Sequence, residues 1–183
     1  MSVTLVLGGA RSGKSRYAES LLRAHPAVTY VAPGSVPDGS DPEWAERISL
    51  HQARRPANWS TEETTDLADV IHAADNPVLI DCLSTWLTQL IDDIDAWGDR
   101  RMAVSHVQEE TARLLDALSS APVDIVLVTN EVGLSVVPST SSGRMFRDEL
   151  GRLNAAVSAA SDQIFLVVAG RVLDLSDCPV VGP

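Results

Sequence analysis

The sequence predicts an α/β fold in which a mostly parallel β-sheet is covered by helices on both faces. Five short segments are apolar at consecutive positions, which is typical of strands buried on both sides. These segments are residues 5–7, 28–32, 78–80, 125–128 and 164–169. Stretches with the helical spacing of apolar side chains lie between them, as parallel strands joined by crossover helices require. With 183 residues and no internal repeat or domain linker, the chain is expected to form one domain over residues 1–183.

The first apolar segment runs directly into a glycine-rich turn that is followed by a helical pattern. Residues 8–15 match the phosphate-binding motif G-x-x-x-x-G-K-S/T. They are Gly8, Gly9, Ala10, Arg11, Ser12, Gly13, Lys14 and Ser15. Glycines let the backbone turn tightly and direct N–H groups at phosphate oxygens. We expect Lys14 to contact the β- and γ-phosphates and the Ser15 hydroxyl to hold Mg²⁺; the alternative is a chance glycine turn.

A loop and a second helix are predicted after the next apolar strand. Residues 33–41 are dense in proline, glycine, serine and aspartate, so they should form a loop. The helix should begin at Asp41 and Pro42, because aspartate is a favourable N-cap and proline a favourable first helical residue. It must end before Pro56, since the residue before a proline is disfavoured in the helical region.

Basic side chains gather on one face of this predicted helix. Arg47, His51, Arg54 and Arg55 recur at helical spacing, which places them on the same side. One interpretation is a solvated helix face whose charges pair with acidic neighbours. The other is a phosphate-handling site with His51 at its centre. Spacing alone leaves both interpretations open.

A second candidate for metal binding stands at the end of an apolar strand. A short extended piece over residues 57–61 and a helix through residues 67–71 precede this strand, which covers residues 78–81 and ends in Asp81. In phosphate-loop nucleotidases a strand of this kind ends in a carboxylate near the metal. Asp81 is therefore a candidate Mg²⁺ ligand, and capping of the next helix is the alternative.

The rest of the chain continues the alternation of helices and strands. Helices are predicted over residues 84–94, 101–118 and 144–160, and a strand over residues 125–130. Residues 139–142 are polar and are expected to be flexible. Residues 172–175 are predicted to return as a hairpin strand at the edge of the sheet.

Composition limits the partners and the compartment. The net charge of −11 and the pI near 4.6 make nucleic acid and anionic membranes poor partners. The first residues lead into a strand rather than a basic region and a long apolar segment, so no signal peptide is expected. No apolar run approaches the ~20 residues of a membrane span. Cys82 and Cys178 do not make a disulfide framework, so we expect a cytoplasmic protein.

Several further motifs occur with the phosphate-binding motif in a specific combination. They are Arg47-Ile48, His51, Arg54-Arg55-Pro56, Trp59, Leu-Ile-Asp-Cys-Leu at 79–83, Thr-Asn-Glu-Val-Gly at 129–133, Phe146-Arg147-Asp148 and Gly-Arg-Leu-Asn at 151–154. With this combination nearly the whole chain resembles the bifunctional adenosylcobinamide kinase/adenosylcobinamide-phosphate guanylyltransferase family of cobalamin biosynthesis. The phosphate-binding motif alone is shared by many nucleotidases, whereas the combination is specific to this family.

The resemblance implies two reactions on a RecA-like fold. A nucleoside triphosphate, ATP or GTP, phosphorylates the aminopropanol hydroxyl of adenosylcobinamide, and GTP then transfers GMP to that phosphate to give adenosylcobinamide-GDP. The residue that carries GMP in the family corresponds to His51. The family's nucleotide contacts map to residues 8–15 and to Ala32, Pro33, Gly34, Gln52, Ala53, Arg54, Arg55, Glu63 and Asp81. Family members associate as trimers, so the resemblance implies a homotrimer.

Two other functions fit the phosphate-binding motif. One is a small-molecule kinase without guanylyl transfer, in which His51 is a residue of a helix face. The other is a nucleotide-dependent switch or regulatory ATPase, which needs a residue that orients the attacking water and segments ordered by the γ-phosphate. The sequence offers no clear pair of such features, although the loop at residues 33–41 keeps this alternative open. The products formed from GTP with and without the corrinoid acceptor distinguish these functions.

Overall fold

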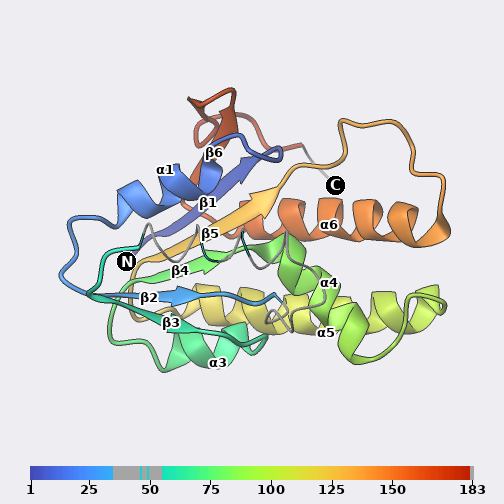
Figure 1. Cartoon of the computed structure of the whole chain (residues 1–183), viewed down its shortest axis with the longest axis horizontal. Helices are drawn as coiled ribbons and strands as arrows, with labels where there is room; N and C mark the ends of the chain where they lie inside the picture. Colours follow the sequence, from blue (N-terminus) through green and yellow to red (C-terminus); the bar gives the residue numbers. More distant parts are fainter. Residues whose placement is uncertain (35–45, 47–48, 50–54, 182–183) are drawn as a thin grey trace.

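The computed structural model describes residues 1–34, 46, 49 and 55–181, and it confirms the predicted α/β architecture (Figure 1). Within these residues, seven strands form one sheet in the order β3-β2-β4-β5-β1-β6-β7. Their bounds are β1 Val3–Gly8, β2 Val28–Val31, β3 Trp59–Glu62, β4 Val78–Asp81, β5 Ile125–Asn130, β6 Gln163–Val168 and β7 Arg171–Asp174. Every neighbouring pair is parallel except β6 and β7.

Helices connect the strands and cover both faces of the sheet. Their bounds are α1 Lys14–Leu21, α3 Leu67–His72, α4 Leu83–Asp93, α5 Arg100–Ser119 and α6 Ser141–Ala159. One hydrophobic cluster joins α3, α4, α5 and α6 to one face of the sheet, and a second cluster joins α1 to the other face. The sheet is therefore buried on both sides, as the continuous apolar runs predict.

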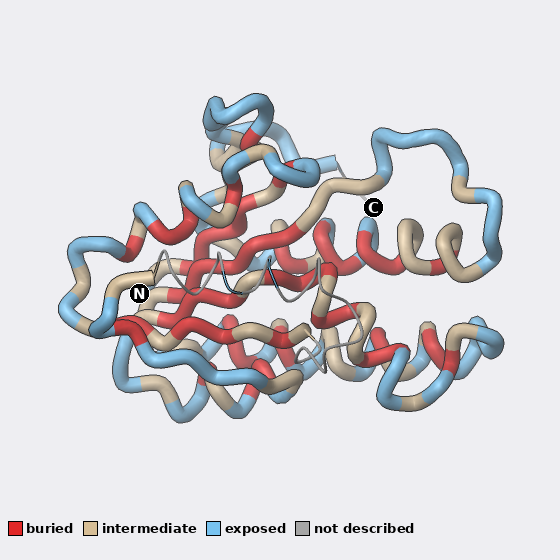
Figure 2. Tube along the Cα trace, viewed as in Figure 1, coloured by how far each residue is buried: buried red, intermediate tan, exposed pale blue. Residues whose placement is uncertain are grey.

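The central strand β5 shows why its sequence is apolar at consecutive positions. Ile125 and Leu127 belong to the cluster beneath α3–α6, whereas Val126 and Val128 belong to the cluster beneath α1. All four side chains are at most 3% exposed. Figure 2 shows the same pattern as buried residues that run along the middle strands of the sheet. Removal of apolar surface from water, worth roughly 25 cal/mol per Å², is the main force that holds these layers together.

The sheet ends in the hairpin that the sequence predicts near residues 172–175. In the antiparallel pair of β6 and β7, Val168 lies opposite Arg171, so Ala169 and Gly170 form the whole turn. Both residues have positive φ angles, of 50° and 72°. A two-residue turn with this geometry matches the twist of paired strands, and glycine adopts it readily.

One predicted loop is partly wrong. Residues 139–142 are expected to be flexible, but α6 begins at Ser141 rather than at residue 144. The reason is an N-cap: the Thr140 hydroxyl accepts a hydrogen bond from the backbone N–H of Gly143 at 3.1 Å. This bond satisfies one of the N–H groups that the first helical turn leaves unpaired.

Two remaining expectations concern the predicted basic helix and the membrane. The predicted helix between residues 42 and 55 lies almost entirely outside the described residues. Among the helices that are described, none is long and apolar enough to cross a membrane.

Candidate nucleotide-binding site

The parallel strands bring many of the predicted site residues to one edge of the sheet. β1 ends at Gly8, where the phosphate-binding loop begins, and β4 ends at Asp81. Ala32 follows β2, and its backbone N–H donates a hydrogen bond to the carbonyl of Glu62 in β3 at 2.8 Å. Ligands of open α/β sheets bind outside the carboxyl ends of the strands. This edge is therefore the candidate site.

The loop over residues 8–15 has the backbone expected of a phosphate cradle. Gly13 has a φ angle of 100° and Arg11 one of 56°, so the chain turns sharply through the left-handed region. Helix α1 begins at Lys14, directly after this turn. The N-terminal end of a helix carries partial positive charge and unpaired N–H groups. Loop and helix together form a site for an anion such as a phosphate.

Lys14 and Ser12 place polar groups inside this loop. Lys14 is only 5% exposed, and its Nζ donates a hydrogen bond to the carbonyl of Gly9 at 3.4 Å. The Ser12 hydroxyl oxygen is buried and has no hydrogen-bond partner among the described residues. Buried polar atoms are normally hydrogen-bonded, so a group that lacks a protein partner can be satisfied by a ligand. Phosphate oxygens are acceptors that fit the hydroxyl of Ser12.

The β6–β7 hairpin supports the phosphate-binding loop. The backbone N–H of Gly170, in the hairpin turn, donates a hydrogen bond to the carbonyl of Ser12 at 3.1 Å. A Cβ atom on Gly8 would lie 2.6 Å from the carbonyl oxygen of Val167 and 2.5 Å from the hydroxyl of Ser12. Real Cβ atoms essentially never approach other atoms so closely. The first glycine of the motif is thus required by contact with β6.

Substitution of Gly8 tests this contact. Gly8→Ala is expected to displace the loop and weaken GDP binding by about fivefold or more, because overpacking costs about 1–3 kcal/mol. Gly98→Ala is the matched control, since a Cβ there meets no atom within 4 Å and Gly98 lies outside the predicted site. Calorimetric titration with GDP and thermal unfolding of both variants measure the effect. Wild-type affinity in folded Gly8→Ala would show that the loop tolerates the added methyl group.

Asp81 stands at the end of β4, and β5 separates that strand from β1. The Tyr30 hydroxyl donates a hydrogen bond to Oδ2 of Asp81 at 3.2 Å. The guanidinium carbon of Arg55 lies 3.4 Å from the centre of the Tyr30 ring. Burial raises the pKa of Tyr30 well above its usual range, and the Asp81 carboxylate raises it further, although Arg55 opposes the shift. The Tyr30 hydroxyl therefore remains a hydrogen-bond donor at neutral pH.

The side chains predicted to hold Mg²⁺ are chemically suited to it. Ser15 offers a hydroxyl and Asp81 a carboxylate, and Mg²⁺ at nucleotide sites usually takes one or two protein oxygens besides water and phosphate. The alternative role of Asp81 as a helix cap is wrong, because the N-cap of α4 is Cys82. Within the part of the chain that the structure describes, no group of three or more His, Cys, Asp and Glu side chains could hold a metal.

The structure adds one candidate that the predicted set of site residues does not include, Asn130, the last residue of β5. The strand register pairs Asn130 with Gly8, so it stands beside the start of the phosphate-binding loop. Its Nδ2 donates a hydrogen bond to the Ser84 hydroxyl at 2.7 Å, whereas its Oδ1 is buried without a partner in the described residues. Asn154 holds its backbone, through a hydrogen bond to the Asn130 carbonyl at 3.0 Å. A polar residue at the carboxyl end of an apolar strand was the available signal.

The remaining predicted residues divide into those that are described and those that are not. Ala32 and Gly34 are half-buried and Pro33 is buried, directly after β2. Glu63 is exposed, directly after β3. Four predicted residues lie outside the described residues: His51, Gln52, Ala53 and Arg54.

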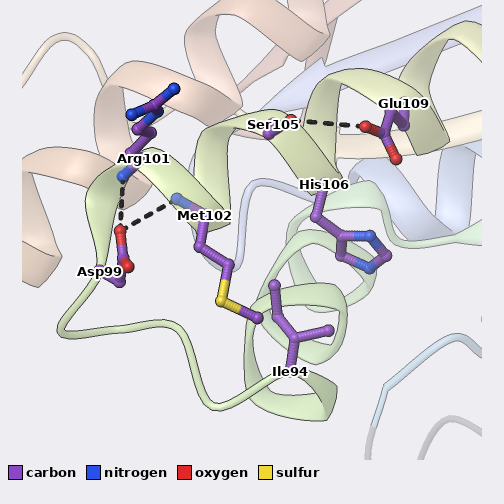
Figure 3. Close-up of a pocket in the computed structure, with 7 residues that line it drawn as sticks. All are labelled: Ile94, Asp99, Arg101, Met102, Ser105, His106 and Glu109. Carbon is purple, nitrogen blue, oxygen red and sulfur yellow. Dashed lines mark hydrogen bonds between the residues drawn. The ribbon is translucent and has the colours of Figure 1, made fainter.

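A depression on helix α5 involves none of these residues (Figure 3). It has a volume of about 440 Å³ and is lined by Ile94, Asp99, Arg101, Met102, Ser105, His106 and Glu109. The Asp99 carboxylate accepts hydrogen bonds from the backbone N–H groups of Arg101 and Met102, both at 3.1 Å. Ser105 donates to Glu109 at 3.4 Å along the same helix. The bonds to Asp99 cap the start of α5, and the bond from Ser105 to Glu109 lies along the surface of the helix.

Comparison with known proteins finds relatives over nearly the whole chain. Residues 4–175 match the family model CobU, described as cobinamide kinase / cobinamide phosphate guanyltransferase. The chain is 39% identical over 176 residues to the bifunctional adenosylcobalamin biosynthesis protein CobU of Salmonella typhimurium, with 91% of this chain and 95% of that protein covered. It is 40% identical over 183 residues to the bifunctional adenosylcobalamin biosynthesis protein CobP of Pseudomonas aeruginosa, with 96% and 98% covered.

A solved structure shares the fold at low sequence identity. It is an ATPase from the type III secretion system of pathogenic bacteria, with a TM-score of 0.58 and 12% identity. The similarity covers 90% of this chain and 50% of that chain. It confirms the predicted α/β fold with a mostly parallel sheet.

Proposed function

We propose a two-step reaction for this chain, which belongs to the CobU family of cobinamide kinase / cobinamide phosphate guanyltransferases, a family of bifunctional transferases. In the first step, ATP or GTP phosphorylates the aminopropanol hydroxyl of adenosylcobinamide. In the second step, GTP transfers GMP to the new phosphate and releases pyrophosphate. The observation that carries the proposal is the phosphate-binding loop after β1, with Lys14 buried inside it.

The kinase step uses the positive groups of the loop. The Lys14 ammonium and the N-terminal end of α1 are fixed before the nucleotide arrives. Preorganised donors of this kind stabilise charge that develops on the transferred phosphoryl group. The proposed nucleotide contacts are those of the sequence analysis: residues 8–15, Ala32, Pro33, Gly34, Gln52, Ala53, Arg54, Arg55, Glu63 and Asp81.

Ser15 and Asp81 are the proposed protein ligands of Mg²⁺. When bound, the ion neutralises charge on the β- and γ-phosphates. Ser15 supplies its hydroxyl from the first turn of α1, and Asp81 supplies a carboxylate that the Tyr30 hydroxyl already holds.

Asp81→Asn tests this assignment. The variant should raise the Mg²⁺ concentration needed for half-maximal phosphorylation of adenosylcobinamide, because an amide oxygen lacks the charge of a carboxylate. Asp93→Asn is the matched control, since Asp93 is an exposed carboxylate at the end of α4 that contacts Gln89. Initial rates across a Mg²⁺ series measure both variants. An unchanged Mg²⁺ requirement in Asp81→Asn would remove Asp81 from the metal site.

The guanylyl step rests on the family resemblance and on the residue pattern around His51. We propose that His51 accepts GMP from GTP and passes it to the phosphate of the acceptor. The reaction products distinguish this proposal from the simpler functions. A switch hydrolyses GTP alone to GDP, a plain kinase forms GDP only with the acceptor, and the proposed enzyme releases pyrophosphate and binds GMP covalently.

The proposed assembly rests on the family resemblance, and the proposed compartment rests on the composition of the sequence. We propose that the chain acts as one domain over residues 1–183, in the cytoplasm, as a homotrimer. Sedimentation at several protein concentrations tests the assembly.

A further inference from the structure

We propose that Tyr30 is a positioning residue that orients the Asp81 carboxylate toward Mg²⁺, with Arg55 packed on its ring. The inference rests on the proposed metal site. It concerns a side chain that the phosphate-binding motif and the predicted site residues do not include.

The strand register explains how Tyr30 reaches Asp81. In the parallel pair of β2 and β4, Tyr30 lies opposite Leu79, and Asp81 follows two residues further along β4. Side chains two residues apart on a strand point to the same face. Tyr30 and Leu79 both belong to the hydrophobic cluster beneath α1. The Asp81 side chain is therefore on the face of the sheet that α1 covers, and α1 starts at the phosphate-binding loop.

Two contacts hold the Tyr30 side chain, one at its hydroxyl and one on the face of its ring. Its side chain is 2% exposed, and its hydroxyl donates to Oδ2 of Asp81 at 3.2 Å. The Arg55 guanidinium carbon lies 3.4 Å from the ring centre, a cation–π contact. Arg55 is held in turn, because its Nη1 donates to the Thr61 hydroxyl at 2.9 Å. Thr61 is the residue opposite Tyr30 in the β2–β3 pair, so the three side chains form one connected row.

This row gives the carboxylate a defined orientation. A carboxylate has about four lone-pair positions on its two oxygens, and the bond from Tyr30 takes one of those on Oδ2 and fixes how the group is turned. Partners of metal ligands orient the ligand, and their loss typically costs about 10–100-fold in metal affinity or activity. Tyr30 has the geometry of such a partner.

Tyr30→Phe removes the hydroxyl and keeps the ring on which Arg55 packs. The Mg²⁺ concentration that half-saturates the GDP-bound protein should rise by about tenfold, whereas the affinity for GDP without Mg²⁺ should remain unchanged. Calorimetric titrations of Mg²⁺ into the GDP complex, and of GDP in chelator, measure the two quantities. A Mg²⁺ affinity equal to that of the wild type would overturn the proposal.

Tyr17→Phe is the matched control. It makes the same chemical change at the chain's other tyrosine, whose ring packs edge-on against Phe165 with centroids 5.3 Å apart. A phenylalanine keeps this packing, so Tyr17→Phe should match the wild type in both titrations. An equal loss of Mg²⁺ affinity in Tyr17→Phe would show a general effect of tyrosine removal and overturn the specific role of Tyr30.

A spectroscopic measurement tests the contact without removing it. Tyr17→Phe protein labelled with 3-fluorotyrosine contains one reporter, at position 30. Addition of Mg²⁺ to its GDP complex should shift the ¹⁹F resonance, and Asp81→Asn should abolish the shift. A resonance whose position does not change at saturating Mg²⁺ would overturn the proposal.

Comparison of variants separates this inference from the proposed function. If Asp81→Asn lowers Mg²⁺ affinity and Tyr30→Phe does not, the result supports the proposed metal site and contradicts the role of Tyr30. If neither variant affects Mg²⁺ affinity, the result contradicts both the assignment of Asp81 as a metal ligand and the role of Tyr30.

Discussion

Lys14→Ala is expected to lower the rate of adenosylcobinamide phosphorylation by about 10²–10³-fold, the usual effect of removing one preorganised charge-stabilising donor. Lys14 is buried in the loop, and its Nζ is already held by the carbonyl of Gly9. The ammonium therefore needs little reorganisation when negative charge develops on the γ-phosphoryl group. Loss of the side chain removes that charge and leaves the backbone of the loop in place.

The measurement is the initial rate of phosphate transfer at saturating nucleotide and acceptor. Arg16→Ala is the control, because Arg16 is an exposed cation on the same helix and is not among the predicted contacts. Thermal unfolding of both variants checks that the fold is intact. Near-normal phosphorylation by Lys14→Ala would mean that the loop is not the catalytic nucleotide site.

The sequence was sufficient to predict the fold because the pattern of apolar residues along each strand directly indicates which faces are buried. β5 is apolar at consecutive positions, and the structure shows alternate side chains in two separate hydrophobic clusters. The phosphate-binding loop was equally predictable, because its glycines and lysine stand at a fixed spacing within eight consecutive residues. Gly13 adopts a positive φ angle, and Gly8 contacts a neighbouring backbone.

The contacts that complete the site depend on residues far apart in the chain, so the local patterns did not reveal them. The Gly170 N–H supports the loop from the β6–β7 hairpin, and Tyr30 reaches Asp81 from another strand. The early start of α6 was missed for a local reason, since the cap formed by Thr140 was hidden in a polar stretch. The contacts of Gly170 and Tyr30, by contrast, follow from strand order and register, which the sequence pattern does not specify.

His51→Ala is expected to abolish the covalent attachment of GMP to the protein while phosphorylation of adenosylcobinamide persists. In the proposed step, a neutral ring nitrogen of His51 attacks the α-phosphorus of GTP. The bond between the α-phosphorus and the bridging oxygen breaks, and pyrophosphate leaves. The phosphate oxygen of adenosylcobinamide phosphate then attacks the same phosphorus. The N–P bond breaks, and adenosylcobinamide-GDP forms.

The residue types around His51 suit this chemistry. Histidine titrates near ~6.5, so much of the imidazole is neutral and nucleophilic at neutral pH. If the predicted helix places Arg47, Arg54 and Arg55 beside His51, their charges would favour the neutral form by repulsion. Arginine also binds phosphate oxygens through paired hydrogen bonds, which would hold the α-phosphate and the departing pyrophosphate. A two-step transfer lets one nucleotide site serve a bulky acceptor without both substrates being in line at once.

The decisive experiment uses GTP labelled with ³²P at the α-phosphate. Wild-type protein should retain label that is released by acid and stable to alkali, as expected for a phosphoramidate. His51→Ala should retain no label, whereas His106→Ala should label normally, since His106 lies on α5 outside the predicted site. Label retained by His51→Ala would exclude His51 as the carrier of GMP. A wild-type enzyme that forms adenosylcobinamide-GDP without ever holding label would exclude the covalent route, because a direct transfer from GTP needs no protein-bound intermediate.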